Sequence, residues 1–211
     1  ELSHSSPQTV SANVPLAVLF DLDGTLIDTA PEFVAIGLQL RRAAGLPDIA
    51  PEAIRSSVSD GAVGMVATAL DMATTDPAFE QWRQRFLDDY EKGLGQHSEP
   101  YPGLRKLVST LASVGIKWGV VTNKLSRFAH PLMEIMAFDP PADIIITPDD
   151  VSQPKPHPES LILACKRLNC PPDRSVFVGD HLRDIEAGNA AGCATIAAAY
   201  GYLAEGESAA A

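Results

Sequence analysis

The chain has few cysteines and no concentration of basic charge. Its three cysteines, Cys165, Cys170 and Cys193, cannot all pair, and none stands in a Cys-x-x-Cys spacing. This favours a reducing compartment over a disulfide framework. No run of basic residues exceeds two, and the net charge is −11. We therefore expect no nucleic-acid partner.

The sequence also lacks a convincing membrane span or secretory signal. One long uncharged stretch, 187–204, is built of Ala and Gly with Asn, Thr and Tyr, and we interpret it as a helix end, a buried strand and a loop. Residues 1–15 lack the charged-then-apolar pattern of a signal and resemble a flexible tail, whereas 204–211 contain too little apolar surface to become ordered. We expect a cytoplasmic protein with no membrane partner. The sequence leaves open its oligomeric state and whether its C-terminus is truncated or disordered.

What is present is enough apolar sequence for one core with one insertion. The 211 residues are 45% hydrophobic and 20% charged, as in ordinary globular proteins. Short apolar runs mark five expected strands, and helical periodicity fills the intervals between the last four; the runs are 16–20, 116–121, 143–146, 175–178 and 194–198. Alternating strands and helices predict an α/β fold with a parallel sheet that binds ligands at the carboxyl ends of its strands.

The alternation is interrupted once, between residues 30 and 97. This segment shows helical patterns, with Gly45, Gly61 and Gly64 as expected breaks. We predict a small helical domain inserted into a core formed by residues 16–29 and 98–203. Because the insertion leaves from the end of the first strand, it is placed to act as a lid over a site built there.

Two carboxylates follow the first strand. Asp21 and Asp23 are two residues apart, and Gly24 allows a sharp turn directly after them. Acids held close together repel each other, and a hard divalent cation such as Mg²⁺ relieves the repulsion. An ordinary turn or a calcium loop is the alternative, but the calcium loop needs a further acid or amide near Leu26, which the sequence does not provide.

Polar residues also end three later strands. Thr122 offers a hydroxyl, although it could instead cap the helix expected near Ser126. Lys155 stands between two prolines that stiffen its backbone. Asp180 ends the fourth strand, and Asp184 follows one helical turn later, where acids often serve only as partners of the helix dipole.

The order of these groups resembles the haloacid dehalogenase superfamily of phosphohydrolases. The resemblance covers about residues 16–203 and lies in the segments 21–27, 120–123, 155–159 and 179–184. It implies a Rossmann-like core with strand order 5-4-1-2-3 and a helical cap after the first motif. This location of the cap agrees with the insertion inferred above.

The resemblance also implies a role for each group. Asp21 is the expected nucleophile, which forms an aspartyl-phosphate, and Asp23 the expected acid and base. The expected phosphate-binding residues are Thr122, Asn123 and Lys155. Asp21, the backbone carbonyl of Asp23 and Asp180 are expected to bind Mg²⁺, with Asp184 behind them orienting either the water on the metal or Lys155.

Other functional classes are weighed against this one. A non-catalytic receiver-like module would be shorter and lack the cap, and a dehalogenase normally dispenses with the second acid, whereas a phosphomutase shares it.

Two residues depart from the common family pattern, His157 and His181. Each is either a solvated loop histidine or, for His181, a pH-sensitive contact near the metal or the phosphate.

The small phosphorylated substrate is inferred from the cap and one part of the core. The chain is similar to the phosphoglycolate-phosphatase-like branch, and resemblance within it favours N-acetylmuramic acid 6-phosphate over 2-phosphoglycolate or another small sugar phosphate. The cap loop with Ser59, Asp60 and Gly61 suits sugar hydroxyls better than the carboxylate of a two-carbon acid. Arg127 is the candidate to engage the substrate carboxylate or phosphate. Alternatively, Arg127 lies on a solvent-exposed helix face and contacts no substrate.

Overall fold

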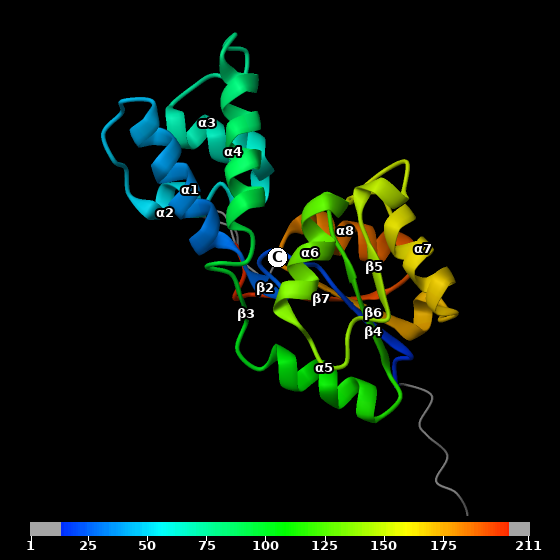
Figure 1. Ribbon diagram of the computed structural model, residues 1–211. Coiled ribbons are helices and arrows are strands. Elements are labelled where there is room, and N and C mark those ends of the chain that lie inside the picture. Colours follow the sequence, from blue (N-terminus) through cyan, green and yellow to red (C-terminus); the bar gives the residue numbers. More distant parts are fainter. Residues whose placement is uncertain (1–13, 203–211) are drawn as a thin grey trace, which may run out of the picture.

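A five-stranded parallel sheet forms the centre of the larger part of the molecule (Figure 1). The computed structural model describes residues 14–202. The strands are β1 (Ala17–Phe20), β4 (Lys117–Val121), β5 (Ile144–Ile146), β6 (Ser175–Gly179) and β7 (Ala194–Ala197). Each strand coincides with one of the apolar runs of the sequence.

The strand order is β5-β4-β1-β6-β7. These labels differ from the expected 5-4-1-2-3 because the structure contains two short strands that the sequence analysis did not predict, β2 (Ile27–Asp28) and β3 (Glu99–Pro100). When only the five core strands are numbered along the chain, the observed order is 3-2-1-4-5, which reads 5-4-1-2-3 from the other edge. β1 lies at the centre, where its end is flanked by those of β4 and β6.

Helices cover both faces of the sheet. Helices α5 (Leu104–Ser113) and α6 (Ser126–Met136) pack on the face that receives Val18, Phe20 and Trp118. Helices α7 (Glu159–Leu168) and α8 (Leu182–Ala191) pack on the opposite face, against Ala17 and Leu19. Successive residues of β1 thus enter different cores, which explains its uninterrupted apolar sequence.

A second group of helices lies between β2 and β3. It contains α1 (Ala30–Ala43), α2 (Pro51–Arg55), the short helix η1 (Val58–Asp60), α3 (Gly61–Leu70) and α4 (Phe79–Gly93), and we call it the helical unit. Its core includes Phe33, Phe86 and Tyr90. Gly64 was expected to break a helix, but it lies within α3, where the flanking residues supply a continuous apolar face.

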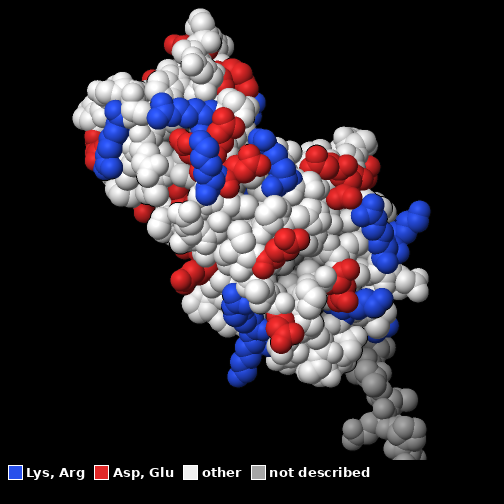
Figure 2. Space-filling model, viewed as in Figure 1, with Lys and Arg blue, Asp and Glu red and all other residues white. Residues whose placement is uncertain are grey.

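Two single-turn helices, η2 (Pro148–Asp150) and η3 (Pro172–Arg174), complete the core. No helix in residues 14–202 is long and apolar enough to cross a membrane. On the face shown in Figure 2, acidic and basic side chains intermingle over both the core and the helical unit. The flexible tail expected over residues 1–15 lies outside the described residues, apart from positions 14 and 15. The disordered end expected over residues 204–211 lies wholly outside them.

Candidate active site

A cavity of about 420 Å³ lies between the carboxyl ends of the central strands and the helical unit. The core lines it with charged and polar side chains, and the helical unit contributes mostly apolar and aromatic ones. Among its lining residues are Asp21, Asp23, Thr122, Asn123, Lys124, Lys155, Asp180, His181 and Arg183 from the core, and Phe33, Val58, Ser59, Asp60, Gly61, Met65, Arg83, Phe86, Leu87 and Tyr90 from the helical unit.

Three carboxylates meet at the core side of the cavity. Asp21 follows β1, Asp180 follows β6, and Asp184 lies in the first turn of α8; one oxygen of each lies within 4.8 Å of the others. The Lys155 ammonium lies 2.9 Å from Asp21 Oδ1 and 2.7 Å from Asp184 Oδ1, and it donates to the Val121 carbonyl. The cluster therefore has three acids and one cation, and all four side chains are buried.

This imbalance of charge changes the protonation of Asp21. Burial, and then the negative charge of Asp184, raise its pKa from 3.8 to about 7 despite the neighbouring Lys155. Burial also raises the pKa of Asp180. A buried oxygen cluster with excess negative charge fits a hard divalent cation. The structure brings Asp184 close enough to Asp21 and Asp180 to serve as a ligand itself, whereas the sequence suggested a place behind the ligands.

Asp180 is held from two directions. Thr25 Oγ1 donates to its Oδ1 at 3.0 Å, and the backbone N–H of Tyr202 donates to its Oδ2 at 2.8 Å. Gly24 passes directly beside this carboxylate with φ of +79°, so that an added Cβ would collide with Asp180 and with the ring of Tyr202. The turn after Asp23 thus requires glycine for both its conformation and its close approach.

Asn123 serves the Lys155 loop in the structure. Its side-chain amide donates to the Lys155 carbonyl at 2.8 Å and accepts from the Lys155 N–H at 3.1 Å. The amide oxygen and one of the two amide hydrogens are therefore engaged by the Lys155 backbone, and the binding of phosphate by Asn123 stays a prediction. Thr122 Oγ1 accepts from the Lys124 N–H at 3.0 Å. Its own hydroxyl hydrogen remains available to a ligand.

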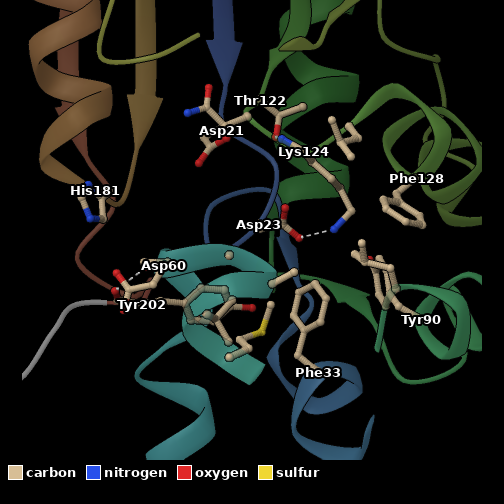
Figure 3. A pocket seen from close by; sticks show the side chains of 18 of the residues that line it. Asp21, Asp23, Phe33, Asp60, Tyr90, Thr122, Lys124, Phe128, His181 and Tyr202 are labelled. Carbon is tan, nitrogen blue, oxygen red and sulfur yellow. Dashed lines mark hydrogen bonds and ion pairs between the residues drawn. The ribbon is translucent and has the colours of Figure 1, made fainter. Parts of the chain in front are cut away.

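Asp23 lies at the boundary between the core and the helical unit. Its Oδ1 accepts from Thr29 Oγ1 at 2.6 Å and pairs with Lys124 Nζ at 2.9 Å (Figure 3). The Lys124 ammonium also lies 4.9 Å from the ring centre of Phe33 and 4.6 Å from that of Tyr90. Asp21 and Asp23 thus both face the cavity but pair with different lysines.

The other predicted residues divide into two groups. Ser59, Asp60, Gly61 and His181 line the cavity. Arg127 is exposed, does not line the cavity and packs its guanidinium over the Phe128 ring, so its expected contact with substrate is not supported by the geometry. The alternative of a solvated helix face describes it better.

The two histidines both cap local backbone. His157 is exposed, and its Nδ1 accepts from the Glu159 N–H. His181 Nδ1 accepts from the Arg183 N–H at 3.2 Å and so caps α8. His157 is thus a solvent-exposed loop histidine, as one alternative expected. His181 is half-buried at the cavity, and its pH-sensitive contact with the metal or the phosphate stays a prediction.

Sequence reasoning missed several lining residues. Lys124 directly follows Thr122 and Asn123, so its position after a functional strand end was a usable signal. Tyr202 and Arg183 carried no comparable signal, because their partners are distant in sequence. The Arg183 guanidinium donates to the Ser59 carbonyl at 2.7 Å and joins the core to the helical unit.

The haloacid dehalogenase-like hydrolase family model matches residues 18–198. The chain belongs to this family, whose hydrolases are generally metal-dependent. Among curated relatives, an N-acetylmuramic acid 6-phosphate phosphatase from Pseudomonas aeruginosa is 46% identical over 187 residues, which are 89% of this chain and 83% of that protein.

Other relatives carry a different substrate in their names. A phosphoglycolate phosphatase from Xylella fastidiosa is 36% identical over 197 residues, covering 92% of this chain and 84% of that protein. The crystal structure of a predicted phosphoglycolate phosphatase from Haemophilus somnus 129PT is 27% identical, with a TM-score of 0.79 over 89% of this chain and 86% of that one. The chain is accordingly a phosphatase of this family, a phosphoric monoester hydrolase.

Proposed function

We propose that the chain is a Mg²⁺-dependent phosphatase that forms an aspartyl-phosphate on Asp21 and hydrolyses N-acetylmuramic acid 6-phosphate, in the cytoplasm, during cell-wall recycling. The observation that carries the mechanism is the buried cluster of Asp21, Asp180, Asp184 and Lys155 at the floor of the cavity. The three free cysteines suit a reducing compartment.

In this mechanism the chain's own residues position the phosphate and move one proton. Asp21 attacks phosphorus, and Lys155 and Thr122 neutralise and hold the phosphate oxygens. Asp23 gives a proton to the departing alkoxide and then takes one from the water that releases phosphate. Asp21, Asp180 and the Asp23 carbonyl would hold Mg²⁺, with Asp184 beside them, and the bound ion would supply further positive charge to the phosphate oxygens.

The cavity supports a sugar phosphate as the substrate. Its volume of about 420 Å³ falls among clefts of ~300–1,000 Å³ that enclose ligands much larger than a two-carbon acid. The apolar wall formed by Val58, Met65, Phe86 and Leu87 suits the methyl groups of an N-acetylated, lactyl-bearing sugar. Arg83 on α4 pairs through Nε and Nη2 with Glu80, and its Nη1 is left to donate to the carboxylate of the sugar, the role expected of Arg127.

The mechanism is tested by replacing Asp21. Purified Asp21→Asn should release no phosphate from N-acetylmuramic acid 6-phosphate or p-nitrophenyl phosphate with Mg²⁺, because the amide is a poor nucleophile. Asp173→Asn is the matched control, since Asp173 is exposed in η3 and does not line the cavity. Substantial turnover by Asp21→Asn would contradict the assignment.

A further inference from the structure

Helix α1 begins without the side-chain cap that its sequence provides. Thr29 stands at the N-cap position, where a hydroxyl usually accepts a backbone N–H of the first turn. The structure shows no such hydrogen bond from its side chain. The Thr29 hydroxyl donates instead to Asp23 Oδ1 at 2.6 Å.

Tyr202 supplies the missing acceptor from the far end of the chain. Its hydroxyl oxygen accepts the Thr29 N–H at 2.7 Å and the Ala30 N–H at 2.8 Å, and its hydrogen is donated to Asp28 Oδ1 at 2.7 Å. A phenolic hydroxyl has one donor and two acceptor positions, so its capacity is fully used. Burial raises the pKa of Tyr202, which keeps this hydroxyl protonated.

The same residue reaches the acid cluster and the helical unit. Its backbone N–H donates to Asp180 Oδ2, its carbonyl accepts from Ser59 Oγ at 3.2 Å, and the Arg55 guanidinium lies 5.3 Å from its ring centre. Tyr202 is 5% exposed. It therefore links the end of β6 with the start of α1.

We propose that Tyr202 is a positioning residue for the phosphatase reaction: by accepting the backbone N–H groups of Thr29 and Ala30, it fixes the turn that holds the Thr29 hydroxyl against Asp23. This rests on the proposed function, in which Asp23 protonates the leaving alkoxide. Without the Tyr202 hydroxyl, the Thr29 N–H loses its acceptor, and the Ala30 N–H keeps only its longer bond to Asp28 Oδ1 at 3.3 Å. The turn that carries Thr29 is then held less firmly, and the Thr29 hydroxyl moves away from Asp23.

The test compares two leaving groups. A sugar alkoxide needs a proton to depart, whereas p-nitrophenolate does not, so misplacing Asp23 slows an alkyl phosphate selectively. For Tyr202→Phe we expect kcat/KM, which reports the steps up to departure of the leaving group, to fall on N-acetylmuramic acid 6-phosphate about tenfold or more beyond any loss on p-nitrophenyl phosphate. If 2-phosphoglycolate is the better substrate, it takes the place of the sugar phosphate. Amide hydrogen exchange at Thr29 and Ala30 should become faster.

Two further variants complete the design. Tyr200→Phe is the matched control, because Tyr200 is exposed and its hydroxyl donates to the Thr25 carbonyl, away from α1. Both substrates should be hydrolysed as by the wild type. Asp28→Ala removes the acceptor that orients the Tyr202 hydroxyl and should give the same selectivity at smaller size. If Tyr202→Phe does not fold, Asp28→Ala tests the same proposal.

The outcomes separate this proposal from the proposed function. Equal losses of kcat/KM on both substrates, or unchanged amide exchange at Thr29 and Ala30, would overturn the role of Tyr202 while leaving the phosphatase intact. A wild-type enzyme that hydrolyses none of the three phosphates would overturn the proposed function itself. In that case the exchange measurement still decides whether Tyr202 caps α1.

Discussion

The acid cluster predicts an unusual dependence of stability on pH. The pKa of Asp21 is raised in the folded protein from 3.8 to about 7, so the native state holds this proton more tightly than the unfolded chain does. The metal-free protein should therefore lose stability as the pH rises from about 4 to about 7, and the loss should level off above that range. At 1.36 kcal/mol per pKa unit, the contribution of Asp21 is about 4 kcal/mol.

The assay is thermal unfolding of the metal-free protein between pH ~5 and pH ~8. In this range most of the shift of Asp21 is sampled, and for a chain of this size the midpoint should fall by roughly 5–10 °C. Mg²⁺ offsets the repulsion, so a hundredfold excess over its dissociation constant should raise the free energy of unfolding by about 2.7 kcal/mol. The same Mg²⁺ concentration should stabilise the protein more at alkaline than at acidic pH, because protons compete with the metal for the carboxylates at acidic pH.

Asp21→Asn separates this effect from other titrations. The amide removes the buried charge, so the metal-free variant should unfold at a higher temperature than the wild type at alkaline pH and show a weaker decline, which Asp180 sustains because burial raises its pKa as well. A metal-free wild type whose stability rises from pH ~5 to pH ~8, or an Asn variant with an undiminished slope, would refute the reasoning.

Three further substitutions test separate parts of the site. Gly45→Ala places a Cβ at positive φ in open space and should lose about 1–2 kcal/mol in urea unfolding. Gly24→Ala should lose more than that, and only this variant should lose Mg²⁺-dependent activity, because its Cβ also meets Asp180; equal activities of the two variants would contradict this. Lys155→Met leaves two buried carboxylates unpaired and should cost about 3–5 kcal/mol in the same assay without metal, and a loss below about 1 kcal/mol would exclude a tight buried pair. His181→Ala removes the cap of α8 and should cost about 1 kcal/mol with an unchanged pH profile of kcat, so a shifted profile would favour a titrating role for this histidine.

The central strands and the polar residues that end them could be predicted from the sequence. An uninterrupted apolar run bounded by acids and glycine, as at residues 17–24, has few structural meanings other than a buried strand with a functional loop. Because parallel strands end at one edge, the sequence could also predict that Asp21, Thr122, Lys155 and Asp180 would meet. Strands β2 and β3 were not predicted, because a strand of two residues is too short to show an alternating pattern.

The sequence failed to place side chains whose position depends on the phase of a helix or on a contact with a residue far away in the sequence. Arg127 was placed by counting one turn from Thr122, but α6 begins only at Ser126, and its buried face starts with Phe128. The two hydrogen bonds between the Asn123 amide and the Lys155 backbone could not be predicted either, because they join residues 32 positions apart. Tyr202 is separated from Thr29 by 173 residues, and no local pattern signals that contact.

The central claim is that this site hydrolyses the phosphate of an N-acetylated sugar acid. The most direct test compares kcat/KM of the purified protein with Mg²⁺ on N-acetylmuramic acid 6-phosphate and on 2-phosphoglycolate, with Arg83→Gln measured beside the wild type. The proposal predicts a clear preference for the sugar phosphate that weakens in Arg83→Gln. A clear preference of the wild type for 2-phosphoglycolate would contradict it.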